Sequence, residues 1–523
     1  MSIKYWLPLV TLLMLLPKPV LAAHSGSAPT DPSKPDDENF IIDTDSGLDT
    51  GCTFREEGPL VFKVKIDRYV GETNSDGTLK EPQKLITLRL VSKSAQLKMP
   101  AYDIDLSDGE VDEVYFNGHK LDTPLQGSNG TWNENSFTVP IEWVKFPTAR
   151  SVNGEKPVAA ENEIRVDIDT RSQGWCTSID WAELNFKAMA PLILVHGIGA
   201  NPQDAWEVEP GVTDYLTSLG VPFEHRIRIG PNDRILPLRN RQGEIVEAGN
   251  AQAIEGEVRR VAQSFGVQKV HLVGHSKGGL DSRGYLNEFY HPEEIQVLSL
   301  HTISSPHHGS VLADISTAAR TLNPRPVAQD GDGEMRDYIE SDFWLERIGG
   351  AFNRGPQLPG LANLQTEFMA DFNRDNPFPT NVRLYTYGAD ADLNRDGNIT
   401  REEAAPLLPH IPPFVDAGEQ GTRAYHLLRD VSTIRVIEIP LPSPINIPFP
   451  GVVFENELQR VPTTSPQLND LLVTDTSSQY PSQRQHFGPT LENEWLHRNH
   501  RDVKHPGVMN SILETISTDF PVN

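Results

Sequence analysis

Residues 272–279 read LVGHSKGG, so Ser276 stands in a G-x-S-x-G turn directly after an apolar run. In that setting the turn between a strand and a helix is sharp and strained, and it lifts the serine hydroxyl clear of a parallel sheet. A nucleophile needs that exposure. Ser276 is therefore the candidate nucleophile of this chain.

The flanking residues supply the helix and the strand that the motif requires. Residues 251–265 carry apolar side chains at helical spacing, and Gly266 follows as a C-terminal stop. Residues 270–273 are a short apolar run of the buried-strand type. The apolar face of the predicted helix consists of Ile254, Val258, Val261, Ala262 and Phe265. These flanks favour a nucleophile over the alternative, a buried serine in a glycine-rich loop.

The amino terminus has the pattern of a secretory signal. Residues 1–22 contain a charged Lys4, an apolar core from Trp6 to Leu16 and small residues for cleavage near Ala22. The apolar core is too short to cross a bilayer. We predict a soluble, exported mature protein without a transmembrane segment, located outside the cell or in the periplasm.

The chain is strongly acidic. Its 523 residues carry a formal charge of −26, and removal of the signal with its two lysines lowers this to −28. A field of that sign repels nucleic acids and anionic membrane surfaces, so neither is an expected partner. The length suggests two to four domains by the usual size of a domain.

The chain contains two cysteines, Cys52 and Cys176. In an exported protein the default expectation is a disulfide between them, and the alternative is a reactive thiol. Closing a loop of that length stabilises the fold by on the order of 4 to 5 kcal/mol in the chain-entropy model.

Between the signal and the G-x-S-x-G turn, the pattern predicts a linker and an all-β domain. Residues 23–51 are rich in Ser, Pro, Asp and Gly, as linkers are. Residues 52–188 show short alternating strands, for example at 62–66 and 164–168, and Asn117-Gly118 marks a hairpin turn. We predict a β-sandwich over residues 52–188.

This segment resembles the jelly-roll, galactose-binding-like modules that are appended to extracellular enzymes. The resemblance lies in VYFNGHKL at 114–121, FTVPIEWV at 137–144 and ENEIRVDIDT at 161–170. It implies a carbohydrate or polymer ligand. Candidate aromatic platforms for such a ligand are Trp132, Trp143, Trp175 and Trp181. The alternative is that these tryptophans belong to the core.

From residue 189 to 523 strands and helices alternate, which predicts an α/β fold with a mostly parallel sheet. The first apolar strand, LILV at 192–195, runs into the glycine-rich turn HGIG at 196–199. Such a turn supplies the second half of an oxyanion hole. The backbone amides of Ile198 and Lys277 are the candidate donors, and His196 is expected to be a structural hydrogen-bonding residue.

Six motifs in one order resemble the secreted bacterial triacylglycerol lipases of the α/β-hydrolase fold. They are LILVHGIG at 192–199, LVGHSKGG at 272–279, TISSPHHGS at 302–310, LANLQTEFMADFN at 361–373, NDLLV at 469–473 and NHRDV at 499–503. The resemblance covers residues 191–523 and implies the α/β-hydrolase fold and lipase activity.

A serine becomes nucleophilic when a histidine accepts its proton, and a carboxylate orients that histidine. In α/β-hydrolases the chain order is Ser, acid, His. Asp470 resembles the family's acid in its N-D-G-L-V segment, although Leu471 replaces the glycine, and His500 resembles the histidine of its N-H-x-D segment. The competing candidates are His486, His497 and His505 for the base and Asp390 and Asp392 for the acid.

Residues 392–403, DLNRDGNITREE, match an EF-hand calcium loop. The predicted oxygen ligands are Asp392, Asn394, Asp396, Asn398 through its carbonyl, Thr400 and Glu403. Pro406 stops any long following helix, so we predict an isolated, stabilising Ca²⁺ loop; a hydrated polar loop is the alternative. The resemblance to lipases also implies a calcium ligand at Asp502, but Pro506 replaces the family's glutamine, so a second site near Asp502 stays open.

Residues 311–360 form an insertion with amphipathic stretches, which fall at the carboxyl edge of the predicted sheet. The lipases that this chain resembles cover the active site with a lid that opens at an oil–water interface. We predict a lid here, with completion of the core as the alternative.

Together these features predict an exported ester hydrolase, in first place a triacylglycerol lipase with the triad Ser276, Asp470 and His500. A phospholipase, a short-chain esterase or a polyester depolymerase would use the same triad. A different class of function, a non-catalytic extracellular binding or adhesion protein, is disfavoured by the intact motifs.

Overall fold

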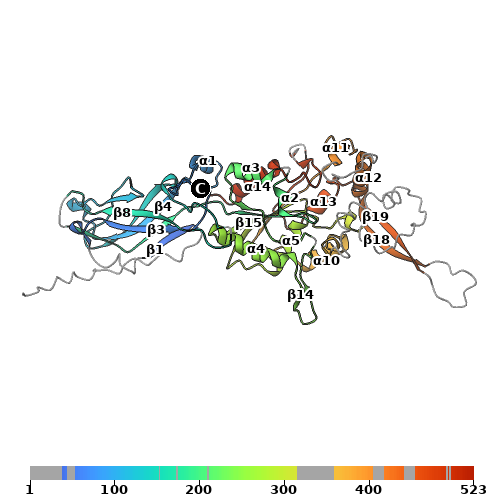
Figure 1. Ribbon diagram of the computed structural model, residues 1–523, viewed down its shortest axis with the longest axis horizontal. Helices are drawn as coiled ribbons and strands as arrows, with labels where there is room; N and C mark the ends of the chain where they lie inside the picture. The colour runs from blue at the N-terminus through green and yellow to red at the C-terminus, as the bar shows by residue number, and fades with distance from the viewer. Residues whose placement is uncertain are drawn as a thin grey trace, which may run out of the picture. The chain divides into compact units, whose positions relative to one another are not determined.

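The computed structural model describes residues 38–43, 53–151, 153–171, 175–208, 211–231, 233–314, 359–404, 417–440, 454–490, 493 and 496–522. The chain divides into two compact units (Figure 1). The first comprises Met1–Ile66, Ser94–Val144 and Glu161–Phe186, and the second Asp67–Lys93, Lys145–Ala160 and Lys187–Asn523. The predicted signal, Cys52 and residues 315–358 of the predicted lid lie outside the described residues.

The first unit contains two sheets. β3 (Leu60–Ile66) buries every second side chain, in agreement with its alternating sequence. It contacts β1 (Asn39–Asp43) and β10 (Trp181–Asn185) of the other sheet. The six-stranded sheet has the order β1-β10-β4-β9-β2, with β7 on β4, and the four-stranded sheet has the order β3-β8-β5-β6. The other strands are β2 (Thr53–Phe54), β4 (Ser94–Tyr102), β5 (Glu113–Phe116), β6 (His119–Lys120), β7 (Trp132–Pro140), β8 (Ala160–Asp167) and β9 (Cys176–Ile179).

The predicted hairpin turn lies between β5 and β6. Asn117 has φ +47° and Gly118 has φ +82°, and both values lie in the left-handed region that a two-residue type I′ turn requires. Phe116 pairs with His119 across the turn. This prediction is confirmed.

One strand falls inside the interval 23–51 that was predicted to be a linker. β1 pairs antiparallel with β10 along its whole length. Phe40 in this strand is buried, and its ring stacks on Phe186 at 5.2 Å. The linker prediction is wrong for residues 39–43, because a short apolar run can complete a sheet even within a polar segment.

The second unit is built on a parallel sheet of order β12-β11-β15-β16-β17-β20. Each adjacent pair in this order is parallel. The strands are β12 (Phe223–Glu224), β11 (Leu192–Val195), β15 (Lys269–His275), β16 (Gln296–Ile303), β17 (Arg383–Tyr387) and β20 (Gln485–Phe487). β11 and β15 are almost wholly buried, as expected for a sheet with helices on both faces.

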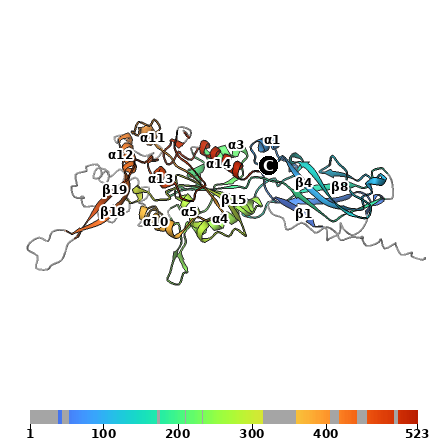
Figure 2. The same cartoon turned by 180° about the vertical axis from the view of Figure 1, so that it is seen from behind.

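Helices cover the two faces of this sheet. α4 (Asn250–Phe265) contacts α5 (Lys277–Glu288), and α3 (Val212–Leu219) contacts α14 (Pro506–Asp519). The two views show these pairs on opposite sides of β15 (Figure 1, Figure 2). The other described elements are α1 (Pro82–Thr87), α2 (Pro202–Trp206), α9 (Pro359–Ala362), α10 (Thr366–Asp375), α11 (Arg401–Ala404), α12 (Ala417–Asp430), α13 (Asp475–Ser478), β13 (Leu238–Arg239), β14 (Ile245–Glu247), β18 (Val431–Pro440), β19 (Phe454–Pro462) and the 3₁₀ turns η1 (Arg55–Glu57), η2 (Leu106–Asp108) and η3 (Ile141–Trp143).

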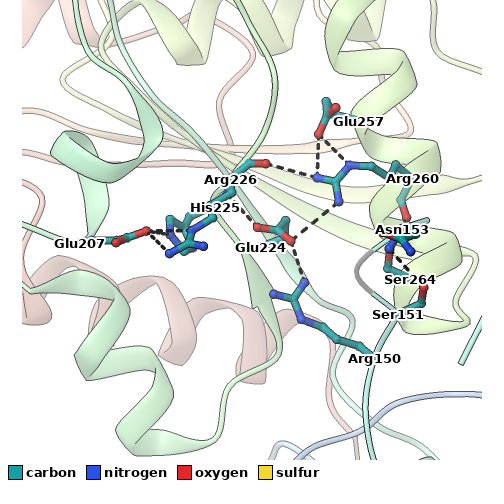
Figure 3. A network of polar contacts seen from close by, with 10 residues as sticks. All are labelled: Arg150, Ser151, Asn153, Glu207, Glu224, His225, Arg226, Glu257, Arg260 and Ser264. Atoms are coloured by element: carbon teal, nitrogen blue, oxygen red, sulfur yellow. Dashed lines mark hydrogen bonds and ion pairs between the residues drawn. The ribbon is translucent and has the colours of Figure 1, made fainter. Parts of the chain in front are cut away.

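Two segments from within the predicted β-domain, residues 67–93 and 145–160, belong to the second unit. The amide of Tyr69 donates to the Phe265 carbonyl at 2.9 Å, at the end of α4. Arg150 reaches the buried Glu224 of β12 at 2.7 Å, and Arg260 lies 3.9 Å from the same carboxylate (Figure 3). The predicted division at residue 188 therefore differs from the observed one, because these segments bind residues far ahead of them in the chain.

Arg150→Met is expected to destabilise the second unit by about 1 to 3 kcal/mol, since it removes the closest cation from a buried carboxylate. Burial opposes ionisation of Glu224, but the charge and hydrogen bond of Arg150 outweigh it, so the pKa of Glu224 lies below its usual value. A carboxyl with a lowered pKa stabilises the fold above its unfolded pKa, and this contribution is lost as the pH falls through the folded pKa. The destabilisation should therefore shrink on acidification.

Urea unfolding of native and variant chains at neutral and acidic pH measures this effect. Arg226→Met is the matched control, because the Arg226 side chain is 70% exposed and pairs with Glu207 at the surface. Equal unfolding midpoints for the Arg150 variant and the control would contradict the prediction.

Candidate active site

Ser276 lies at a strained turn between β15 and α5. Its backbone has φ +55° and ψ −130°, a conformation that costs a non-glycine residue about 1 to 3 kcal/mol. A Cβ on Gly274 would lie 2.5 Å from the Gly279 nitrogen, and one on Gly278 would lie 2.5 Å from the carbonyl oxygens of Val195 and His196. The predicted strand, tight turn and helix are present, and the two glycines allow the close approach.

Asp470 and His500 form a buried pair. Nδ1 of His500 lies 2.7 Å from Oδ2 of Asp470, and the His500 amide donates to the Asp470 carbonyl at 2.9 Å. Oδ1 of Asp470 accepts the amides of Leu472 at 3.0 Å and Val473 at 2.7 Å. These amides fix the carboxylate, and the carboxylate orients the imidazole and determines that Nε2 is free to accept a proton.

His500 lies beside the residue that precedes Ser276. Nε2 of His275 lies 2.8 Å from the His500 carbonyl oxygen, and the two rings are 4.8 Å apart. Burial, followed by the charge of Lys504, holds the pKa of His275 well below its usual value, so His275 is neutral and donates this bond. Among the described residues no hydrogen bond joins the Ser276 hydroxyl to His500, and catalytic hydrogen bonds often tighten only when substrate binds.

The candidate oxyanion donors lie on both sides of Ser276. Lys277 is the first residue of α5, so its amide is among those without an intrahelical acceptor. Ile198 follows Gly197, and a Cβ on Gly197 would lie 2.8 Å from the Ser276 Cβ. Both amides therefore belong to turns that adjoin the serine.

The ammonium of Lys277 has a different role from its amide. Nζ lies 2.6 Å from Oδ1 of Asp281, and both side chains are buried. Oδ2 of Asp281 accepts from Asn250 of α4 at 2.9 Å, so this network ties α5 to α4. The sequence analysis missed the pair, although a lysine and an aspartate four residues apart on a predicted helix are a recognisable signal.

The competing residues have other partners. His486 lies 3.0 Å from Asp475, and His505 accepts the Gly507 amide as the N-cap of α14. His497 lies 3.6 Å from Asp390 and does not contact Asp470 through any described hydrogen bond. Asp470 is thus the carboxylate that His500 contacts. His196 is buried, with Nδ1 3.1 Å from the Gly197 carbonyl, in line with a structural role.

Leu471 has φ +76°, in the left-handed region where glycine is favoured. The N-D-G-L-V segment of the lipases has glycine at this position. This chain has leucine there, but in a backbone conformation that glycine favours. The Leu471 side chain is fully buried, and this packing offsets the strain.

The loop at residues 392–403 closes on itself through its predicted ligands. Asp392 accepts the amides of Asp396 and Gly397, and Glu403 accepts those of Leu393 at 2.9 Å and Thr400 at 2.6 Å. Gly397 has φ +83° at the sharp turn. The all-oxygen donor set fits calcium. Within the described part of the chain, however, no three His, Cys, Asp or Glu side chains are grouped closely enough to hold a metal ion.

This loop, together with Ala391 directly before it, is hydrogen-bonded to both segments that carry the Asp470–His500 pair. Asn499 Nδ2 donates to the Glu403 carbonyl at 3.0 Å, and the Ala391 amide donates to the Asn469 carbonyl at 2.8 Å. Asn499 also donates to Asp502, the residue suggested for a second calcium site, and that site stays a prediction.

Several predictions concern residues that the structure describes only in part. Of the segment predicted to be a lid, the structure describes residues 311–314 and 359–360, so the lid stays a prediction. The disulfide also stays a prediction, because Cys52 lies outside the described residues. Trp181 is buried, the Trp132 ring packs on Tyr102, and the Trp143 ring stacks on His119 at 4.5 Å. The sugar-platform role of these tryptophans stays a prediction. No described helix is long and apolar enough to span a membrane.

Comparison with curated proteins reveals a partial similarity to lipases. The chain is 32% identical over 188 residues to a triacylglycerol lipase of Pseudarthrobacter phenanthrenivorans, which spans 36% of this chain and 54% of that protein. It is also 32% identical over 188 residues to a triacylglycerol lipase of Burkholderia plantarii, spanning 36% of this chain and 48% of that one. The chain thus spans about half the length of these relatives. No family model matches the chain.

Solved structures of lipases are also similar to this chain. A Bacillus licheniformis lipase in its mature form is 18% identical, with 62% of this chain and 91% of that chain covered at a TM-score of 0.36. Lipase 1 of Pelosinus fermentans is 15% identical, with 63% and 98% covered at a TM-score of 0.33. The fold of the second unit is defined by its parallel strand order β12-β11-β15-β16-β17-β20.

Proposed function

We propose that the protein is an exported carboxylic ester hydrolase whose substrate is a triacylglycerol. One arrangement carries the proposal: Asp470 binds His500, and His500 lies against the residue preceding Ser276 in its strained turn. The partial similarity to triacylglycerol lipases supports the ester class of substrate. The predicted signal at residues 1–22 supports export, and the acidic charge is compatible with a neutral lipid substrate.

In this proposal Ser276 Oγ attacks the ester carbonyl while Nε2 of His500 takes its proton. Asp470 holds the Nδ1 proton and stabilises the imidazolium that forms. The amides of Ile198 and Lys277 stabilise the oxyanion, typically by about 3 to 4 kcal/mol per donor. His500 then protonates the departing alcohol, and water releases the acyl group by the same steps.

A fluorophosphonate probe tests the nucleophile directly, because it reacts with an activated serine and not with an ordinary hydroxyl. We expect one label per chain, on the peptide that contains Ser276, and loss of ester hydrolysis in proportion to labelling. Labelling of another serine, or none, would overturn the assignment of the nucleophile.

Ester profiling tests the substrate class. Faster turnover of soluble short-chain esters or phospholipids than of emulsified long-chain triacylglycerol would overturn triacylglycerol as the substrate, but the proposal of an ester hydrolase would stand.

We also propose that residues 392–403 bind one calcium ion and thereby stabilise the segments that hold Asp470 and His500. Glu403→Gln should reduce bound calcium by one ion per chain, as measured by equilibrium dialysis with elemental analysis. At calcium one hundred times its Kd, loss of this ion would remove about 2.7 kcal/mol of stability. Glu402→Gln is the matched control, because that neighbour is exposed. Unchanged calcium content in the Glu403 variant would contradict the proposal.

A further inference from the structure

The β13–β14 hairpin of the second unit presents apolar side chains to solvent. Leu238 is 44% exposed, Ile245 37% and Val246 59%. The two strands form a sheet of their own, and Figure 1 shows the hairpin projecting away from α4 and α5. Of the ten large apolar side chains that are exposed in the described part of the chain, three belong to this hairpin. Single exposed apolar residues are ordinary, whereas a concentration of them marks a surface that binds a partner.

The turn holds the hairpin in a fixed shape. The Asn240 amide donates to the Glu244 carbonyl at 2.9 Å, and the Gly243 amide donates to the Asn240 carbonyl at 3.0 Å. Oδ1 of Asn240 accepts the amides of Gln242 at 3.0 Å and Glu244 at 2.9 Å. An isolated two-stranded hairpin is only marginally stable in water. These bonds therefore keep the apolar side chains displayed on an element that the core does not support.

The hairpin begins beside the candidate active site. Leu236, two residues before β13, packs against an apolar cluster that Ile198 also contacts. The amide of Ile198 is a candidate oxyanion donor. The same cluster contains Ala313, which lies within the predicted lid segment 311–360, and Leu361, which directly follows it. A surface that binds the hairpin would therefore lie next to the entrance that the predicted lid covers.

The charges of the hairpin balance. The charged residues among 238–247 are Arg239, Arg241, Glu244 and Glu247. With two of each sign the hairpin has no net charge, although the whole chain has a formal charge of −26. Arg239 reaches Glu288 of α5 at 3.1 Å, so the hairpin is also tied to the helix that follows the nucleophile turn. An uncharged element with exposed apolar side chains fits a surface that is itself apolar and uncharged.

We propose that the β13–β14 hairpin adsorbs the protein to the surface of a neutral-lipid droplet, with Leu238, Ile245 and Val246 in contact with the oil. This inference rests on the proposed function, because it assumes that the substrate is a water-insoluble triacylglycerol. Transfer of these side chains from water into oil supplies the binding free energy. Because the hairpin is bonded to α5 and begins beside the oxyanion turn, adsorption brings the candidate active site to the interface where triacylglycerol is exposed.

Adsorption is measured without turnover, in full-length Ser276→Ala chains mixed with a triolein emulsion. Leu238→Ser combined with Val246→Ser should lower the partition coefficient on the order of tenfold, because both side chains lose their contact with oil. Leu88→Ser combined with Val158→Ser is the matched control, since it removes the same two residue types from exposed positions elsewhere in the second unit. It should leave adsorption unchanged. Equal adsorption of the two double variants would overturn the proposal.

Salt and surface charge distinguish the neutral lipid surface from other partners. Adsorption to triolein should persist in about 1 M sodium chloride, because it does not depend on attraction between charges. Loss of adsorption in salt, or stronger binding to phosphatidylglycerol vesicles than to triolein, would overturn the proposal. A dimer in sedimentation that the hairpin double variant converts to monomer would also overturn it, since the hairpin would then join two copies of this chain.

Hydrogen exchange keeps the proposal testable if the hairpin double variant does not fold. In the Ser276→Ala chain, triolein droplets should slow amide exchange at residues 236–249 and leave α1 unchanged. Unchanged exchange at 236–249 in the adsorbed protein would overturn the proposal. Neither readout requires ester hydrolysis. Adsorption through the hairpin by a chain that hydrolyses no ester would refute the proposed function alone, whereas a hydrolase whose adsorption ignores the hairpin would refute this inference alone.

Discussion

Ser276→Ala should abolish ester hydrolysis, with a fall in kcat on the order of 10⁶-fold, as in serine hydrolases that lose their nucleophile. The reason is specific to this position. The Ser276 backbone is held at φ +55° between a buried strand and the first turn of α5, and the residue before it, His275, contacts the His500 carbonyl. No other described serine shares this combination, so water attack without the hydroxyl is the only remaining route at this site.

The measurement is steady-state hydrolysis of a chromogenic fatty ester, with circular dichroism to verify folding. Ser218→Ala is the control, because Ser218 lies exposed on α3 and its hydroxyl bonds only to its own helix at Tyr215. It should retain native turnover. A Ser276 variant that folds and still hydrolyses ester within tenfold of the native rate would remove the serine mechanism from this protein.

The local elements of the second unit could be predicted from the sequence because their signals are local. The helix predicted at 251–265 is observed at 250–265, and Gly266 ends it with φ +68°. The strand predicted at 270–273 is longer by one residue at its start and two at its end. Apolar periodicity and a glycine stop are properties of neighbouring residues, so a single sequence contains them.

The division of the chain into units could not be predicted in the same way. Residues 67–93 and 145–160 have no pattern that distinguishes them from the strands around them. Their place in the second unit depends on partners such as Phe265 for Tyr69 and Glu224 for Arg150, which lie tens to hundreds of residues away. Such pairings form only when distant parts of the chain pack together, so neither composition nor periodicity predicts them.

The candidate site shows the same contrast. The sequence offered three acids and four histidines, and resemblance selected Asp470 and His500, which the structure places 2.7 Å apart. The contact of His275 with the His500 carbonyl was missed, because a motif shows residue types and not main-chain hydrogen bonds. The Lys277–Asp281 pair has the i, i+4 spacing of a helical ion pair, but the sequence does not show that both side chains are buried.

Asp470→Asn is the second change with a large expected effect, a fall in kcat on the order of 10⁴-fold at neutral pH. Asparagine preserves the shape of the side chain, but its amide group can donate to Nδ1 of His500 and so stabilise the tautomer that cannot accept the serine proton at Nε2. The amides of Leu472 and Val473 strengthen this effect, because they donate to the oxygen of the introduced side chain and thereby direct its NH₂ group toward His500.

Asp390→Asn and Asp475→Asn are matched controls, since each removes a carboxylate that faces a different histidine, His497 or His486. The measurement is the ester hydrolysis rate of the three variants across pH, which shows which carboxylate activity depends on. If Asp390→Asn loses more activity than Asp470→Asn, the acid has been assigned to the wrong segment, whereas the expected order leaves His500 as the base that Asp470 orients.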